Sequence, residues 1–145
     1  MLSEYLAKDK ILLNLKATDL KEALTQMLRL STEAKHSMII NSIMERESLM
    51  STALGKGVAL PRIIIEDKAK TEIIVALSPF GISMKSLDLL PVKIIFLYLF
   101  SEKDGYPAIL AQSLRLLSEE SLRAALLNSN TTDDIITIIK KWEAD

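Results

Sequence analysis

Two side chains in this 145-residue sequence could do chemistry, Arg62 and the single histidine, His36. Arg62 follows a Gly-x-Gly turn, three apolar residues and a proline. Its guanidinium could hold a phosphate or a carboxylate through paired, charge-assisted hydrogen bonds. The same group stays charged and has no free lone pair, so it can bind an anion but cannot carry a phosphoryl group. A solvated arginine in a loop is the alternative, and the sequence leaves both open.

The histidine and cysteine content restricts the remaining chemistry. Because His36 is the only histidine, a multi-histidine metal site is excluded and a Ser-His-Asp mechanism would depend on this one residue. We expect His36 to be an exposed or capping residue near a helix start, with phosphoryl acceptance as a minor alternative. The lack of cysteine excludes disulfides, cysteine metal sites and thiol catalysis. No metal and no cofactor are therefore expected.

Composition predicts one globular domain over residues 1–145, since 49% of residues are hydrophobic and 26% are charged. The net charge of -1 gives no overall field that favours nucleic acid or an anionic membrane. The apolar runs are too short to span a bilayer, and the first residues lack the pattern of a signal peptide. We expect a cytoplasmic protein with no nucleic acid partner and no membrane insertion.

One strand and two helices are predicted before the Gly-x-Gly turn. Residues 10–16 form a short apolar run that indicates a strand. Thr18 is expected to cap a helix over residues 19–34. A second helix is expected over residues 37–49, and its apolar stripe should fill the core: Met38, Ile39, Ile43, Met44 and Leu49.

Strands dominate the predicted middle of the chain, and helices its last third. Gly55 and Gly57 bracket a turn, because glycine adopts positive φ angles at little cost. A polar tip is expected at residues 66–68 and a loop at 78–81. Strands are expected at residues 58–60, 71–77 and 92–100, and a strand or an extended loop at 63–65. Helices are expected at residues 106–117, 118–127 and 131–142. This order predicts an α/β fold, a three-layer α/β/α sandwich around a mixed, roughly five-stranded sheet.

Residues 45–62 read Glu-Arg-Glu-Ser-Leu-Met-Ser-Thr-Ala-Leu-Gly-Lys-Gly-Val-Ala-Leu-Pro-Arg. This run resembles the active-site segment of phosphotransferase-system enzyme IIA domains of the fructose, mannitol and nitrogen-regulatory class. In that family a Ser-Thr-Gly-(Ile/Leu)-Gly turn, a short strand and a proline lead to the histidine that carries the phosphoryl group. Arg62 stands at the position of that histidine, and Met50 and Ala53 replace glycines usual in the family. The resemblance implies a phosphocarrier scaffold whose acceptor is missing.

Two further segments extend the resemblance over nearly the whole chain. Residues 110–118 resemble the family's helix after the sheet, and the alignment places Tyr106 where a second, assisting histidine stands. Both family histidines are then replaced, and the implied fold is that of the phosphotransferase/anion transport proteins. Within residues 81–96 the family pattern is kept at four positions: Asp88, Pro91, Val92 and Phe96.

The resemblance also implies a site for a partner or an anion. In the family an arginine at the helix end and the Ser-Thr pair surround the phosphohistidine, and Arg46, Ser51 and Thr52 match these positions. Glu45 and Glu47 are expected to form surface ion pairs with the arginines, worth no more than about 1 kcal/mol. Tyr106 could donate a hydrogen bond to an anion, or pack over the Gly-rich turn. The candidate site residues are Arg46, Ser51, Thr52, Arg62 and Tyr106, with no catalytic residue among them.

Three functions are compatible with these residues. The first is a regulatory module that binds proteins, since unphosphorylated nitrogen-regulatory members of the family bind kinases, transporters and other targets. The second is an active phosphoryl carrier from the phosphocarrier HPr to a sugar permease through another acceptor, such as His36. The third is a sensor that binds phosphate or another small anion among Arg46, Thr52 and Arg62. The expected partners are thus an HPr-like carrier, a permease or a regulatory target.

Overall fold

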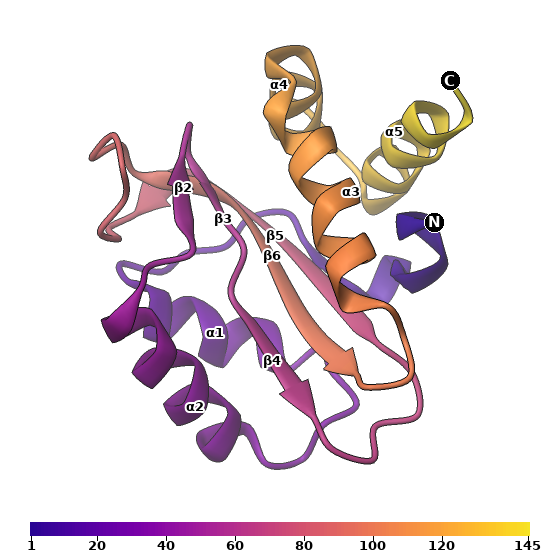
Figure 1. Cartoon of the computed structure of the whole chain (residues 1–145). Helices are drawn as coiled ribbons and strands as arrows, with labels where there is room; N and C mark the ends of the chain where they lie inside the picture. Colours follow the sequence, from indigo (N-terminus) through magenta and orange to yellow (C-terminus); the bar gives the residue numbers. More distant parts are fainter.

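An antiparallel pair of strands, β5 (Glu72–Ile82) and β6 (Val92–Ser101), lies at the centre of the computed structural model, which describes residues 1–145 (Figure 1). Successive side chains of a strand point to opposite faces of the sheet. Both faces are covered here, which explains why the two segments are almost continuously apolar. One face carries Ile73, Val75, Leu77, Ile94, Phe96, Tyr98 and Phe100, and the other Ile74, Ala76, Ile95, Leu97 and Leu99.

The expected mixed sheet is confirmed and contains six strands in the order β1-β5-β6-β3-β2, with β4 also pairing with β6. Strands β3 and β4 follow one another along the same edge of β6, separated by Leu60 and Pro61, and the backbone N–H of Tyr98 donates to the Pro61 carbonyl at 3.0 Å. The remaining bounds are β1 Ile11–Leu12, β2 Ala53–Gly55, β3 Val58–Ala59 and β4 Arg62–Ile65.

Helices cover both faces of the sheet, as expected for three layers (Figure 1). Helices α1 (Leu20–Leu28) and α2 (His36–Leu49) cover one face. The other face is covered by α3 (Tyr106–Ser118), α4 (Glu120–Leu127), α5 (Thr132–Ala144) and the N-terminal 3₁₀ turn Leu2–Tyr5, and a second 3₁₀ turn spans Lys8–Lys10. None of these helices combines the length and the apolar character needed to cross a membrane.

The first helix is shorter than predicted and has a different cap. Asp19, not Thr18, accepts the capping hydrogen bond from the backbone N–H of Glu22 at 2.9 Å. The Glu22 carboxylate in turn accepts from both the backbone N–H and the hydroxyl of Thr18. The helix ends at Leu28 rather than at residue 34. At this end the hydroxyl and the backbone N–H of Ser31 both donate to the Leu28 carbonyl and compete with helical hydrogen bonds.

The prediction of a loop at residues 78–81 was wrong, because β5 continues to Ile82. The register with β6 shifts between Leu77 and Ile82, so the strand contains an irregularity of the bulge type. Gly81 has φ +79°, and such irregularities accommodate a residue such as Pro79 that has no N–H to donate.

The apolar stripe of α2 is also narrower than predicted. Ile39, Ile40 and Ile43 are buried, whereas Met38 and Leu49 are 61% and 84% exposed. Only one side of the helix is buried, because α2 lies at the outside of the domain, beside α1 (Figure 1).

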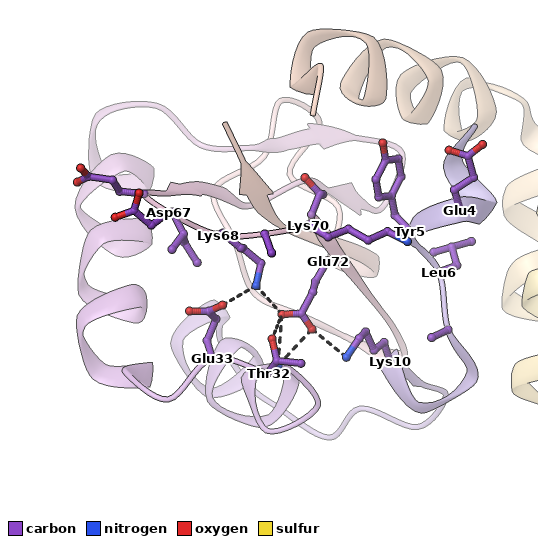
Figure 2. A pocket seen from close by; sticks show the side chains of 15 residues that line it. Glu4, Tyr5, Leu6, Lys10, Thr32, Glu33, Asp67, Lys68, Lys70 and Glu72 are labelled. Carbon is purple, nitrogen blue, oxygen red and sulfur yellow. Dashed lines mark hydrogen bonds and ion pairs between the residues drawn. The ribbon is translucent and has the colours of Figure 1, made fainter. Parts of the chain in front are cut away.

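The polar tip expected at residues 66–68 is confirmed for Glu66 and Asp67, which form an exposed turn, whereas Lys68 belongs to a buried ionic network (Figure 2). Lys68 is only 8% exposed, and its ammonium group binds Glu33 and, at 2.8 Å, Glu72. The ammonium group of Lys10 lies 2.8 Å from the second oxygen of Glu72, and the Thr32 hydroxyl donates to Glu72 at 2.7 Å. The network joins the start of β5 to the loops that follow α1 and β4.

The charge of Glu72 is maintained by its partners. Burial alone raises the pKa of this carboxyl, but the hydrogen bonds from Lys10, Lys68 and Thr32 outweigh it and lower the pKa from 4.5 to about 2. The carboxylate of the folded protein is therefore charged at every pH well above its pKa of about 2.

Glu72→Gln is expected to lower the free energy of unfolding by about 3 kcal/mol, because it leaves the buried ammonium group of Lys68 and the partly buried one of Lys10 without their shared counterion. Urea unfolding at neutral pH measures this change. Glu66→Gln is the matched control, since Glu66 is an exposed carboxylate of the same loop with no ion pair. Equal losses in both variants would contradict a special role for the network.

The network also predicts the response to acid. A carboxyl whose pKa is lowered in the folded state contributes stability that is fully present above its unfolded pKa and is lost as the pH falls through its folded pKa. For Glu72 that window runs from 4.5 down to about 2. Unfolding measured at about pH 5, 4 and 3 should show the wild type losing up to about 1.4 kcal/mol per pH unit more than Glu72→Gln. If the free energy of unfolding fell equally with pH in the wild type and in Glu72→Gln, this prediction would be refuted.

Candidate functional site

The Gly-x-Gly turn forms the tip of the β2–β3 hairpin and fixes it against β6. Gly55 and Gly57 have φ +94° and +76°, as the sequence predicted. The Gly57 carbonyl accepts hydrogen bonds from the backbone N–H groups of Lys93 and Ile94 at 2.8 and 3.0 Å. This clamp sets the register in which the following strands run along β6, and hence the position of Arg62.

The hydroxyls of the Ser-Thr pair are used within the protein. The buried Thr52 donates its backbone N–H to one oxygen of Glu47 at 2.9 Å and its hydroxyl to the other. The Ser51 hydroxyl accepts from the backbone N–H of Ala53 at 3.1 Å. Glu47 therefore does not form the ion pair with an arginine that the sequence suggested, and neither does Glu45. A carboxylate of the protein already occupies the donors that a bound anion would take from Thr52.

Arg62 lies in a strand and not in a loop. It is the first residue of β4, pairs in register with Tyr98, and is half-buried. Its guanidinium donates a long hydrogen bond of 3.4 Å to the Leu60 carbonyl and forms no ion pair. Burial lowers the pKa of Arg62, and the nearby charge of Arg46 lowers it further, while Glu47 acts in the opposite direction. The charges of these two guanidinium groups thus act on each other, and neither group forms a salt bridge.

Tyr98 lies beneath Arg62, and sequence reasoning missed it. Because β4 and β6 are parallel and these two residues are register partners, their side chains point to the same face of the sheet. Tyr98 is fully buried, which raises the pKa of its phenol, and its hydroxyl has no hydrogen-bond partner. The nearby Ser113 hydroxyl instead donates to the Ile109 carbonyl at 2.9 Å. In the sequence, the only sign of Tyr98 is its phenolic hydroxyl, the one polar side-chain group within the apolar residues 94–100.

Tyr106 begins α3 and packs on an aromatic residue of β6. Its ring lies 5.5 Å from that of Phe100, and it remains 40% exposed. The suggestion that it packs over the Gly-rich turn was wrong, since that turn is bound at Ile94, about 20 Å away along the strand. Tyr106 lies on the Arg62 side, close enough to affect the pKa of the guanidinium.

His36 is distant from these groups. It starts α2, and its Nε2 atom lies 2.6 Å from the Glu33 carbonyl. Ten residues of helix, about 15 Å, separate it from Arg46 in the last turn. The structure brings together Arg46, Glu47, Arg62, Tyr98 and Tyr106, and it contains no cluster of three or more side chains that could hold a metal ion. This arrangement can bind groups of opposite charge, and it contains no imidazole.

Several characterised proteins have sequences similar to this chain. The fructose-specific EIIABC component of the phosphotransferase system of Bacillus subtilis is 27% identical over 98% of this chain, which spans only 23% of that relative's length. A nitrogen regulatory protein of Bradyrhizobium diazoefficiens is also 27% identical, over 95% of this chain and 94% of the relative.

Solved structures support the same fold. Nitrogen regulatory protein IIA-Ntr from Neisseria meningitidis superposes with a TM-score of 0.84 at 22% identity, covering 95% of this chain and 98% of the other. IIA mannitol from Escherichia coli superposes with a TM-score of 0.76 at 19% identity, covering 92% and 98%. The pattern of one family, described as "Phosphoenolpyruvate-dependent sugar phosphotransferase system, EIIA 2", matches residues 4–142. Over almost its whole length, therefore, the chain belongs to the EIIA 2 family of the phosphotransferase system.

Proposed function

We propose that this chain is a regulatory, protein-binding member of the enzyme IIA family that carries no phosphoryl group on histidine. The observation that carries the proposal is the identity and position of Arg62. It follows Pro61, where the family motif has its phosphorylated histidine, and it is held at the start of β4 by pairing with Tyr98. An arginine there binds anions but lacks the lone pair that phosphoryl transfer requires.

The surroundings of Arg62 support this proposal. Glu47 occupies the hydroxyl and N–H donors of Thr52, so a carboxylate of the chain itself stands beside the two arginines. Phosphorylation acts by adding about two negative charges to a surface. A chain that lacks the acceptor and carries a fixed internal carboxylate presents the same charge pattern at all times. It would bind its partner constitutively.

The nature of the relatives suggests what that partner is. The Bradyrhizobium relative, which this chain matches over nearly its full length, is a nitrogen regulatory protein. Members of that class bind kinases, transporters and regulators in their unphosphorylated form, and we propose such a regulatory target, in the cytoplasm, for this chain.

An active phosphoryl carrier from HPr to a sugar permease is the alternative. It would have to use His36, the only histidine, whose Nε2 atom contacts the Glu33 carbonyl at the far end of α2. The distance between His36 and the family site argues against this alternative.

Labelled phosphoenolpyruvate, enzyme I and HPr test the central claim. Wild type is expected to take up no label, because it has no acceptor at the site. Arg62→His should take up label, since the variant restores an imidazole on an intact docking surface. Arg62→Gln is the matched control, which removes the charge without supplying a nucleophile and should stay unlabelled. Label on wild type that disappears in His36→Ala would refute the proposal and establish the carrier.

The unpaired guanidinium groups of Arg46 and Arg62 also favour a second candidate, a sensor of small anions. Thermal unfolding in millimolar phosphate decides between the candidates, because a ligand that binds only the folded state raises the melting temperature. We expect phosphate to leave the melting temperature of the wild type unchanged, because Glu47 occupies the donors of Thr52. Phosphate should raise the melting temperature of Glu47→Ala, in which these donors are free. A shift in wild type that Arg62→Ala abolishes and Arg29→Ala preserves would establish the sensor instead.

A further inference from the structure

Three leucines of the loop between β5 and β6 point into solvent at one end of the sheet. Leu87, Leu89 and Leu90 are 84%, 85% and 52% exposed, and Leu54 of the adjacent β2 strand is 44% exposed. Figure 1 shows this loop and the β2–β3 hairpin projecting together beyond the end of the sheet. We call these four side chains the apolar tip. Exposed apolar groups gathered in one place usually mark an interaction surface.

Hydrogen bonds hold the loop in the shape that exposes the leucines. Asp88 accepts from the backbone N–H of Lys56 in the hairpin turn at 2.6 Å and from that of Leu90 at 3.1 Å. The buried Ser86 donates its hydroxyl to the Leu90 carbonyl at 3.2 Å. Leu89 has φ +61°, a backbone conformation that is unfavourable for a residue with a side chain. The loop therefore cannot bury its leucines by a simple collapse onto the sheet.

Positive charge surrounds the apolar tip. The hairpin and loop segments, residues 49–58 and 79–93, contain three lysines, Lys56, Lys85 and Lys93, and one acidic residue, Asp88. Residues 16–22, which are bonded to Ser83, add two lysines and two acidic residues and leave this balance unchanged. The Asp88 carboxylate is already bonded to two backbone N–H groups. The local charge is thus positive, although the whole chain has a net charge of -1. A surface of negative charge would complement it.

A second copy of this chain does not fit the apolar tip well. In a symmetric dimer the same patch faces itself, so the lysines of one copy would approach those of the other. The tip is moreover a projection and not a groove, which suits a flat, deformable surface that leucines can enter. Basic residues beside such leucines attract anionic lipid headgroups and bring the apolar side chains to the acyl boundary.

We propose that the apolar tip docks this protein reversibly on an anionic lipid bilayer. The leucines enter the interfacial region, and Lys56, Lys85 and Lys93 contact the headgroups. Along β6, Ile94, where the hairpin is bound, lies about 13 Å from Tyr98, the register partner of Arg62. The apolar tip and Arg62 are therefore different places on the sheet, and this proposal is independent of the function proposed above.

Co-sedimentation with vesicles tests the proposal. The full chain is expected to sediment with vesicles of equal parts phosphatidylglycerol and phosphatidylcholine, to do so less in high salt, and to stay in solution with pure phosphatidylcholine. Leu87→Ser combined with Leu89→Ser should reduce the bound fraction at least fivefold. The matched control combines Leu114→Ser with Leu127→Ser, two exposed leucines of α3 and α4, and should bind as wild type does.

A second pair of variants tests the charges. Lys56→Gln with Lys85→Gln should weaken vesicle binding, whereas Lys140→Gln with Lys141→Gln on α5 should not. Circular dichroism checks that all variants fold, which is expected because every substituted side chain is at the surface.

Three results would overturn the proposal. These are no sedimentation of wild type with anionic vesicles, equal binding of the Leu87/Leu89 variant, or equal binding to neutral vesicles. Light scattering identifies a competing occupant: a wild-type dimer that becomes a monomer in the Leu87/Leu89 variant would show that a second copy covers the tip.

Discussion

The position of every element near the candidate site depends on the backbone pairing of β6. One edge of this strand pairs with β5, and the other holds first β3 and then β4. The Gly57 carbonyl and the Pro61 carbonyl each accept from β6, so the register is fixed on both sides of the proline. A shift of one residue would move Arg62 to the opposite face of the sheet. The hairpin clamp is therefore as important to the site as the arginine itself.

Two groups of charges in this protein have opposite characters. Around Glu72, carboxylates and ammonium groups are paired and largely buried, which holds the loops at the start of β5 together. Around Arg62, the charges of two guanidinium groups act on each other without a salt bridge, and the Glu47 carboxylate is bound to Thr52. The first arrangement stabilises the fold, whereas the second leaves electrostatic attraction available for a partner.

The fold was largely predictable, because alternating and continuous apolar runs report burial directly. Residues 92–100 and the helix start at Tyr106 were placed correctly, as were the turn glycines. The errors fall where local pattern and tertiary contact disagree. A Pro-Phe-Gly sequence indicated a loop but is accommodated within β5, and Lys68 looked like a surface residue but is neutralised by Glu33 and Glu72. Neither partner of Lys68 could be identified from spacing alone.

By itself, the sequence determined which functional group stands after Pro61. The residue after Pro61 is an arginine, and no folding changes the absence of a lone pair on its charged guanidinium. Only the tertiary structure decided what surrounds that arginine. Tyr98 reaches it through strand pairing, Arg46 through the end of α2, and Glu47 is directed to Thr52 rather than to either arginine. These contacts join residues far apart in the chain, and their geometry follows from sheet register and helix packing, which no local pattern encodes.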